Sequence, residues 1–198
     1  MSKRVFDLIA SSISLVLLAP VMAVIAILVR RDSEGPALFK QERVGRGGKA
    51  FTLLKFRSMT ASPATQGPLV TSATDTRITK LGAKLRASKL DELPQLVNVV
   101  RGDMSLVGPR PEVAKYVDLW PQEDREVILS VRPGITDPAT VQLLREEEIL
   151  AQQADPEEYY ITHLIPEKVR GYAEYARTHS ALGDASIILA TLKQVLKG

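Results

Sequence analysis

Near its N-terminus the chain contains an uncharged, largely apolar run of 22 residues, from Leu8 to Val29. As a helix rising about 1.5 Å per residue, the run would be about 33 Å long, enough to cross the hydrocarbon core of a bilayer. A cleaved signal peptide fits less well, because the run is long and continues into Arg30 and Arg31 without a convincing small-residue cleavage site. A buried helix of a soluble core also fits less well, because such helices rarely lack a polar stripe over this length. The run therefore predicts a membrane helix.

Basic residues lie on both sides of this run: Lys3 and Arg4 precede it, and Arg30 and Arg31 follow it. The positive-inside rule favours the cytoplasmic side for both ends, which a single crossing cannot satisfy. Pro20, near the middle, removes one backbone hydrogen bond and favours a kink. A helix–break–helix that enters and leaves the same leaflet satisfies both ends. A kinked helix that spans the bilayer is the alternative that the residues leave open.

The composition limits the chemistry that the rest of the chain can perform. Its 198 residues are enough for one compact domain with a membrane element, and we find no internal repeat and no second domain boundary. The absence of cysteine excludes disulfides, thiolate nucleophiles and cysteine-ligated metal centres. With only two histidines, His163 and His179, a His-rich metal site cannot be built. A catalytic metal would therefore have oxygen ligands, which favours Mg²⁺ or another hard cation.

Charge is distributed unevenly along the chain. Residues 1–115 contain 18 Lys and Arg against 9 Asp and Glu, whereas residues 116–198 contain 8 against 14. A basic first half indicates an anionic partner such as a phosphate, a nucleic acid or an acidic membrane surface. The single Trp, the few aromatic residues among the cations and the lack of a recognisable motif argue against a nucleic-acid binder. A non-catalytic membrane scaffold that binds lipid through basic helices is a further alternative.

Periodicity and turn residues predict an α+β fold that is mostly helical. Two short strands, 37–39 and 51–56, surround a glycine-rich turn, so we expect a small β-hairpin or sheet. A Ser-, Pro- and Thr-rich loop is expected at 60–74. The predicted helices are 76–89, 94–102, 122–131, 141–153, 156–178 and 184–197. Helix 76–89 is basic and amphipathic, which suits a membrane interface, although a solvated basic face on a core-packed helix explains it equally well.

Adjacent carboxylates, Asp91 and Glu92, immediately precede Leu93 and Pro94 at an expected helix start. Acidic residues in this position commonly cap a helix and complement its dipole. Acidic neighbours can also divide labour, with one attacking a phosphorus atom and the other holding magnesium. The pair alone does not decide between these interpretations.

Four cations near this pair in the sequence are candidates for binding phosphate. Arg86 lies upstream, and Arg110 lies downstream in a turn that Pro109 and Pro111 make rigid. An arginine binds phosphate oxygens in a fork geometry that lysine cannot reproduce. Lys55 and Arg57, in the second expected strand, add two more positive charges.

Four stretches carry a family resemblance: KRVFDLIASSISLVLLAPV, GPALFKQERVGRGGKAFTLLKFRSM, TRITKLGAKLRASKLDELPQLVNVVRGDMSLVGPRPE and VRPGIT. Together they cover most of residues 3–136, and in them the chain resembles the bacterial sugar transferases known as monotopic phosphoglycosyl transferases, in their small, catalytic-domain-only form. The resemblance implies transfer of a phospho-sugar from a UDP-sugar to polyprenyl (undecaprenyl) phosphate, with release of UMP. Such a reaction is a first membrane step in the synthesis of a polysaccharide or glycoconjugate.

The resemblance also implies roles for individual residues. By position, Asp91 is similar to the family's nucleophile, which forms a covalent phospho-sugar intermediate, and Glu92 to its partner at Mg²⁺, so both are expected at the metal. Arg110 matches the arginine of a phosphate-binding Pro-Arg-Pro turn. The other three cations, Arg86, Lys55 and Arg57, match basic positions near the site.

The resemblance further implies a re-entrant membrane helix hairpin over residues 1–31 that breaks near Pro20. Residues 32–198 would then form a catalytic domain at the cytoplasmic face of the bacterial inner membrane, in contact with its lipids. We expect no nucleic-acid partner, and the sequence leaves a homo-oligomer open. Two departures stand out. Ala19 replaces the serine that many members have before the proline, and the stretch after VRPGIT differs, which leaves the identity of the sugar open.

Overall fold

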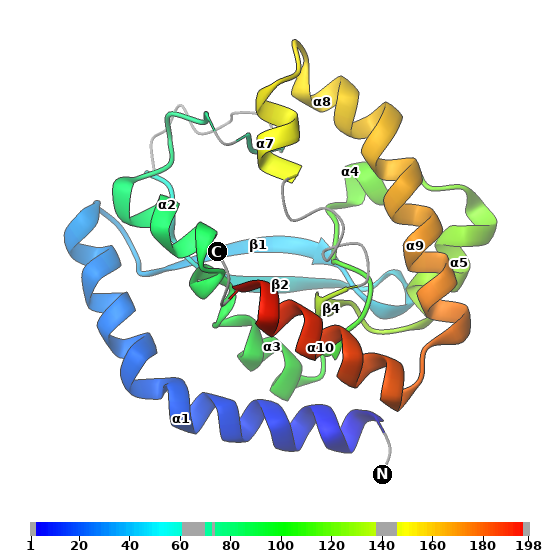
Figure 1. Cartoon of the computed structure of the whole chain (residues 1–198), viewed down its shortest axis with the longest axis horizontal. Coiled ribbons are helices and arrows are strands. Elements are labelled where there is room, and N and C mark those ends of the chain that lie inside the picture. Colours follow the sequence, from blue (N-terminus) through cyan, green and yellow to red (C-terminus); the bar gives the residue numbers. More distant parts are fainter. Residues whose placement is uncertain (1–2, 61–69, 73, 138–145, 196–198) are drawn as a thin grey trace.

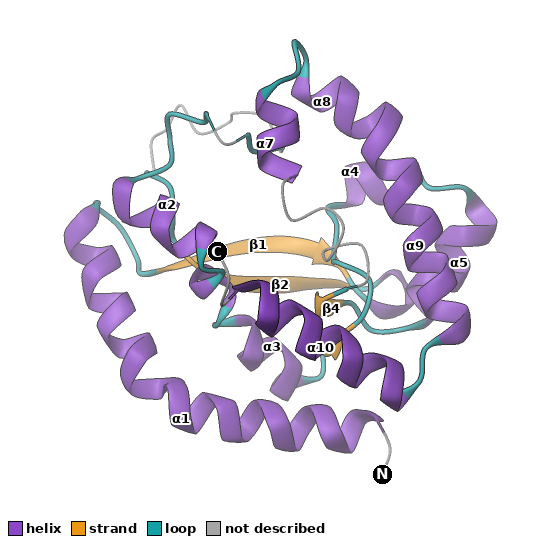
Figure 2. Ribbon diagram, viewed as in Figure 1, coloured by secondary structure: helices purple, strands orange, loops and turns teal. Residues whose placement is uncertain are grey.

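The computed structural model describes residues 3–60, 70–72, 74–137 and 146–195, arranged as Figures 1 and 2 show. Its first element is the long helix α1 (Lys3–Asp32), which lies along one edge of the molecule. By length and composition α1 could cross a membrane. Its apolar side chains are mostly uncovered, with Val16 74% and Leu17 70% exposed. An uncovered apolar helix of this length suits a lipid environment.

Pro20 bends α1 but does not interrupt it. The helix is continuous from Lys3 to Asp32 with Pro20 inside it, and Figure 1 shows it bending near its middle. The predicted helix–break–helix is therefore wrong in one respect, because the chain stays helical through Ala19 and Pro20. A proline removes a single hydrogen bond of the ladder, and the turns on either side keep a bent helix intact.

The predicted β-hairpin is present and longer than expected. Strand β1 (Leu38–Val44) pairs antiparallel with β2 (Ala50–Phe56) along their whole length. A tight turn at Arg46–Gly48 joins them, in which Gly47 and Gly48 have φ of 68° and 74°, values that favour glycine. The first strand is predicted over 37–39 only, whereas in the structure residues 40–44 continue the ladder.

Two short helices follow the hairpin. Helix α2 (Lys80–Ala87) begins later than predicted, because Ile78 forms a bridge with Met59 and the Thr79 hydroxyl caps the helix at Gly82 N. After the short turn η2 (Leu90–Glu92), helix α3 (Gln95–Arg101) lies within one residue of the predicted 94–102 at each end. The predicted loop 60–74 falls largely outside the described residues.

A second small sheet was not predicted. Strands β3 (Ser105–Val107) and β4 (Gly134–Thr136) pair in parallel, joined by α4 (Ala114–Val117) and α5 (Gln122–Ser130). Helix α5 confirms the prediction for 122–131 within one residue. A strand of three residues is too short to produce a recognisable alternation of apolar and polar residues.

The C-terminal third is helical, as predicted. It contains α7 (Glu146–Ala151), α8 (Pro156–Tyr159), a π-helical segment η3 (Tyr160–Leu164), α9 (Ile165–Thr178) and α10 (Ala181–Val195). Residues 141–145 of the predicted helix 141–153 lie outside the described residues, as do 196–197 of the last one. Helices α4, α5 and α9 share the largest apolar core, which includes Tyr116, Trp120, Ile128, Val169 and Tyr172.

Both ends of α1 are attached to the same folded body. At the N-terminal end, Lys3 Nζ lies 2.5 Å from Asp184 Oδ2 of α10, and Asp7 accepts a hydrogen bond of 2.7 Å from the Ser105 hydroxyl. At the other end, Arg57 Nη2 donates to the carbonyl oxygen of Val29 at 3.1 Å. The long helix is therefore held at its start and at its finish by the body that contains the two small sheets.

Candidate active site

A cavity of about 420 Å³ lies beside the β-hairpin, with walls from α2, η2 and the C-terminal helices. This volume is in the range typical of small-molecule sites. All six residues that the sequence analysis proposed as catalytic or phosphate-binding line the cavity: Lys55, Arg57, Arg86, Asp91, Glu92 and Arg110. The structure therefore brings together residues spread over 56 positions of sequence.

Asp91 and Glu92 are buried in the η2 turn, where the chain reverses between α2 and α3. The residue before the turn, Lys89, adopts a left-handed conformation with φ of 56°. Capping does not account for the pair, since α3 begins after Pro94 without a side-chain cap. The exposed fractions are only 4% for Asp91 and 7% for Glu92. Two adjacent buried carboxylates indicate a functional site more strongly than a structural one.

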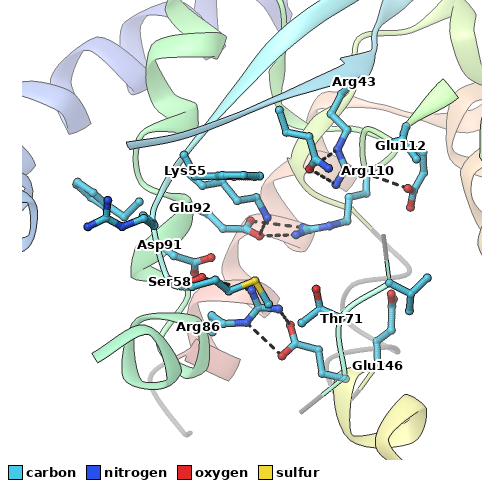
Figure 3. A pocket seen from close by; sticks show the side chains of 18 of the residues that line it. Arg43, Lys55, Ser58, Thr71, Arg86, Asp91, Glu92, Arg110, Glu112 and Glu146 are labelled. Carbon is cyan, nitrogen blue, oxygen red and sulfur yellow. Dashed lines mark hydrogen bonds and ion pairs between the residues drawn. The ribbon is translucent and has the colours of Figure 1, made fainter. Parts of the chain in front are cut away.

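Glu92 is neutralised by two cations. Its Oε1 accepts a hydrogen bond from Lys55 Nζ at 2.9 Å and another from Arg110 Nη2, while Oε2 lies 3.4 Å from Arg110 Nη1. Figure 3 shows the two cations converging on this carboxylate. Burial acts to raise the pKa of Glu92, but Arg110 and Lys55 outweigh it and hold the pKa well below its usual range. Glu92 is therefore ionised at neutral pH.

Asp91 has the opposite environment. Its Oδ1 atom is buried and has no hydrogen-bond partner within the described part of the chain. Burial, and secondly the charge of Glu92, raises the pKa of Asp91. Because this oxygen has no partner among the described residues and Asp91 lines the cavity, Asp91 is the residue of this pair suited to attack an electrophile.

The position of Arg110 is fixed by a close contact between two backbone segments, at Gly108 and Gly134. Its turn follows β3, which pairs with β4 of the VRPGIT segment. A Cβ atom at Gly134 would lie 2.1 Å from Gly108 N, so a side chain there would separate the two segments. This contact explains why a glycine follows Arg132 and Pro133 at this point. The rigid turn then projects Arg110 into the cavity (Figure 3).

Arg86 of α2 reaches the cavity from the side opposite the hairpin. Its guanidinium lies 2.5 Å from Glu147 Oε1 of α7, and its Nη1 lies 3.4 Å from the Ser58 hydroxyl. The side chain of Glu147 is 38% exposed. An anionic ligand could therefore replace this partner at little cost, because exposed ion pairs contribute only about 0–1 kcal/mol.

Arg57 lines the cavity, but its described hydrogen bonds point elsewhere. Nη2 donates to the carbonyl oxygens of Val29 at 3.1 Å and Ser33 at 2.6 Å, at the C-terminal end of α1. Its Nε and Nη1 atoms are buried without a hydrogen-bond partner in the described part of the chain. Arg57 thus anchors the end of the long helix beside the site, and its expected phosphate contact stays a prediction.

The carboxylates suit a metal that arrives with its substrate. Among the described residues, no cluster of three or more His, Asp or Glu side chains could hold a metal ion. Mg²⁺ commonly binds proteins through one or two carboxylates and takes its other oxygens from substrate phosphates and water. Asp91 and Glu92 provide two carboxylates, and Asp91 Oδ1 has no hydrogen-bond partner among the residues that the structure describes. The residues therefore fit Mg²⁺ bound together with a diphosphate.

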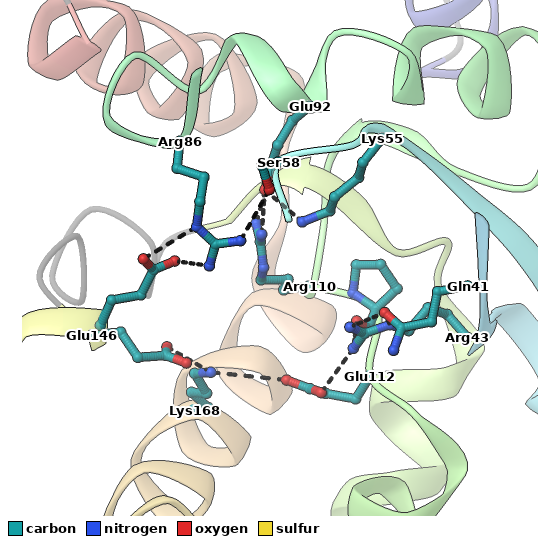
Figure 4. Close-up of polar contacts among 12 residues, drawn as sticks. Gln41, Arg43, Lys55, Ser58, Arg86, Glu92, Arg110, Glu112, Glu146 and Lys168 are labelled. Atoms are coloured by element: carbon teal, nitrogen blue, oxygen red, sulfur yellow. Dashed lines mark hydrogen bonds and ion pairs between the residues drawn. The ribbon is translucent and has the colours of Figure 1, made fainter. Parts of the chain in front are cut away.

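The sequence analysis missed the far side of the cavity. Arg43, Glu112 and Lys168 line it and are joined by ion pairs (Figure 4). Glu112 lies two residues after Arg110, so the same proline-rich turn supplies a side chain to each side. No comparable signal in the sequence marks Lys168, which lies in the first turn of α9.

Comparisons with known proteins show the family to which this chain belongs. The sequence model of a family described as bacterial sugar transferase matches residues 1–198. The chain is 37% identical over 198 residues to the UDP-glucose:undecaprenyl-phosphate glucose-1-phosphate transferase of Caulobacter vibrioides, covering 98% of this chain and 69% of the relative. It is 36% identical over 201 residues to the UDP-N-acetylgalactosamine-undecaprenyl-phosphate N-acetylgalactosaminephosphotransferase of Aeromonas hydrophila, covering 99% and 44%.

A third relative is the UDP-glucose:undecaprenyl-phosphate glucose-1-phosphate transferase of Escherichia coli, 36% identical over 194 residues. The match covers 96% of this chain and 39% of that protein. The chain thus spans about two thirds of the Caulobacter relative and less than half of the other two.

Proposed function

Because the chain belongs to the bacterial sugar transferase family, we propose that it transfers a sugar 1-phosphate from a UDP-sugar to undecaprenyl phosphate and releases UMP. The names of its relatives support this reaction class, and they differ in the sugar, glucose or N-acetylgalactosamine. One observation carries the mechanism: the buried Oδ1 of Asp91 has no hydrogen-bond partner within the described ranges, and Asp91 lines a cavity together with Lys55, Arg86 and Arg110.

The first displacement consumes the donor. The Asp91 carboxylate attacks the phosphorus that bears the sugar, and an Asp91–phosphorus bond forms. The bond from that phosphorus to the bridging oxygen breaks, and UMP leaves with the oxygen and its electron pair. The product on the protein is an aspartyl phospho-sugar. The covalent step allows a water-soluble donor and a lipid-bound acceptor to react in turn rather than together.

The second displacement restores the carboxylate. A phosphate oxygen of undecaprenyl phosphate attacks the same phosphorus, the bond to Asp91 breaks, and the sugar diphosphate lipid is released. Raising the pKa of Asp91 makes its carboxylate more basic in the first step. The neighbouring Glu92, paired with Arg110 and Lys55, keeps these cations oriented toward the cavity until phosphate oxygens compete for them.

Several cations can balance the negative charge of the substrate phosphates. Arg110 and Arg86 are placed to bind oxygens in a fork geometry, and Lys55 adds a point charge. Mg²⁺, held by Asp91 and Glu92 with the diphosphate, would neutralise charge that develops on the phosphate oxygens.

We also propose that α1 enters and leaves the cytoplasmic leaflet. Residues 1–31 would form the membrane element and residues 32–198 the catalytic domain at the cytoplasmic face of the inner membrane. The attachment of both ends of α1 to one body supports this topology, because a helix that spanned the bilayer would carry its ends to opposite faces. The bend at Pro20 supports it too.

The test of the proposed function is UMP release by the purified full chain with undecaprenyl phosphate and a panel of UDP-sugars. We expect release with at least one donor, and an acid-stable trapped adduct of phospho-sugar mass on a peptide containing Asp91. UMP release without an adduct would indicate a direct transfer in which Asp91 only holds the metal. Release of UMP by none of the donors would refute the proposed reaction.

A further inference from the structure

On the far side of the cavity from Asp91, six polar side chains form a second cluster, which we call the distal network. Its members come from β1, the proline-rich turn, α7, η3 and α9: Gln41, Arg43, Glu112, Glu146, Tyr160 and Lys168. Figures 3 and 4 both show Arg110 between Glu92 and Glu112. Arg110 thus separates the carboxylates of the catalytic turn from the distal network.

Glu112 is the centre of the distal network. It accepts hydrogen bonds from Tyr160 OH at 2.5 Å and from Arg43 Nη1 at 3.2 Å, and Lys168 Nζ lies 3.8 Å away. Lys168 is only 4% exposed and lies 2.7 Å from Glu146 Oε2. A buried ion pair contributes little net stability because desolvation offsets the attraction. Stability alone is therefore a weak reason for this cluster.

A local irregularity of the helix assembles the network. Tyr160 and Lys168 are eight residues apart, and in a regular α-helix this spacing would turn their side chains about 80° away from each other. The π-helical segment Tyr160–Leu164 has more residues per turn and takes up this difference. As a result Lys168 Nζ lies 3.0 Å from Tyr160 OH, and both face Glu112. Such π-helical segments are frequent at functional sites.

The charge of the distal network indicates the chemistry of its ligand. Its two cations, Arg43 and Lys168, are balanced by Glu112 and Glu146, so the network has no excess charge for a phosphate. It offers an alternating set of hydrogen-bond donors and acceptors instead. The rings of Tyr116 and Tyr160, whose centroids are 5.0 Å apart, also border the cavity here. Donors, acceptors and aromatic rings together suit a flat, neutral, polar group.

We propose that the distal network binds the uridine of the donor, an assignment that rests on the proposed function. In a phosphoryl displacement the attacking and leaving oxygens are roughly in line, so UMP must leave on the side of the phosphorus opposite to Asp91. With the phosphates at Arg110, the nucleoside lies beyond it, in the distal network. Uridine is also the part that the named donors of the relatives share, UDP-glucose and UDP-N-acetylgalactosamine.

The test measures nucleotide binding without turnover. Equilibrium binding of UMP and CMP is measured with the full chain carrying Asp91→Asn, alone and combined with Tyr160→Phe or Lys168→Met. Tyr160→Phe keeps the packing of the ring and removes only the hydroxyl. Tyr175→Phe is the matched control, because this variant also loses a buried hydroxyl. That hydroxyl lies within hydrogen-bond distance of Asp184 Oδ1 and of the Val107 carbonyl oxygen, and Tyr175 does not line the cavity.

We expect the unaltered network to bind UMP more tightly than CMP. Tyr160→Phe should weaken UMP binding about tenfold and reduce this preference, in line with the loss of one hydrogen bond to an uncharged group. Lys168→Met should weaken UMP binding by at least the same factor, and Tyr175→Phe should leave UMP binding unchanged. In the enzyme with Asp91 intact, Tyr160→Phe should raise KM by the same factor for every accepted UDP-sugar.

Three results would overturn the assignment. Unchanged UMP binding in a folded Tyr160→Phe variant would give the network a structural role only. A rise of KM for one sugar and not for another would mean that the network binds the sugar. An equal effect in the Tyr175→Phe control would show that any loss of a buried hydroxyl weakens binding. Because UMP binding is measured without catalysis, a failure of the proposed reaction would appear separately, as an absence of turnover.

Discussion

Replacement of Asp91 by asparagine should abolish turnover and at the same time make the protein without substrate more stable. The Asp91 carboxyl is 4% exposed, its Oδ1 has no hydrogen-bond partner among the described residues, and the ionised Glu92 is its neighbour. A buried polar group without a partner costs about 1–3 kcal/mol, and more when it is charged. Asparagine removes the charge and keeps the shape of the side chain. We therefore expect a gain of about 1–3 kcal/mol in the free energy of unfolding.

The pH dependence of this gain follows from the direction of the pKa shift. Because the folded-state pKa of Asp91 is raised, the native protein holds its proton over a pH range in which the unfolded chain has lost it. The native protein is therefore destabilised as the pH rises from the unfolded pKa of about 3.9 through the folded pKa. The advantage of Asp91→Asn should be greatest at neutral pH and should disappear as the pH falls below about 4.

Thermal unfolding of the full chain in detergent measures the effect. Trp120, the single tryptophan, is buried against Tyr172 and reports unfolding by its fluorescence. For a chain of this size about 1 kcal/mol corresponds to about 2–4 °C, so we expect the midpoint to rise by about 2–12 °C. Asp118→Asn is the matched control, since the Asp118 side chain is 75% exposed and its replacement should change stability by less than about 0.5 kcal/mol. A variant Asp91→Asn that unfolds at or below the wild-type midpoint at pH 7 would refute the reasoning, and residual turnover would refute the role as nucleophile.

Three further predictions concern the cations, the metal and the membrane. Arg110→Lys should lower kcat/KM by about 10²-fold although the positive charge is kept. The reason is that lysine cannot make the two-point contact that Arg110 makes with Glu92 and would make with phosphate. Equal activity of this variant would mean that the turn has a structural role only. Removal of divalent cations with EDTA should stop UMP release and Mg²⁺ should restore it, whereas turnover that persists in EDTA would contradict the proposed metal. Single cysteines at Ser2 and Glu34, introduced in this cysteine-free chain, should both be labelled by a membrane-impermeant thiol reagent in inverted vesicles and neither in intact cells; labelling of the Ser2 site from outside would mean a helix that spans the bilayer.

Local sequence determined much of the architecture. The run from Leu8 to Val29 is uncharged and largely apolar, which favours a long helix with most of its surface uncovered; its last turns, at Ile25 and Val29, pack into the folded body. The glycine turn between β1 and β2 and the Pro94 and Gly102 boundaries of α3 are also local, because a few residues restrict φ and hydrogen bonding there. These elements depend on neighbours in sequence, so they were predicted close to their observed positions.

The residues of the candidate site could also be named from the sequence. They are an adjacent acidic pair and nearby cations, one of them in a proline-rich turn, and the family resemblance named the same positions. All six indeed line one cavity. The sequence did not predict the interactions of each group. In the structure, Glu92 pairs with Lys55 and Arg110, and Arg57 binds the end of α1. Asp91 Oδ1 has no hydrogen-bond partner in the part of the chain that the structure describes.

Only the tertiary structure decided the features that join distant segments. Strands β3 and β4 are three residues each and exist because Gly108 and Gly134 allow their backbones to touch, a contact that no local pattern encodes. The attachment of both ends of α1 to one body likewise depends on partners such as Asp184, Ser105 and Arg57, which are far away in sequence. The distal network needs a π-helical turn to bring Lys168 to Glu112. Short-range propensity governs a segment's conformation, whereas the free energy of these contacts appears only when the chain has closed on itself.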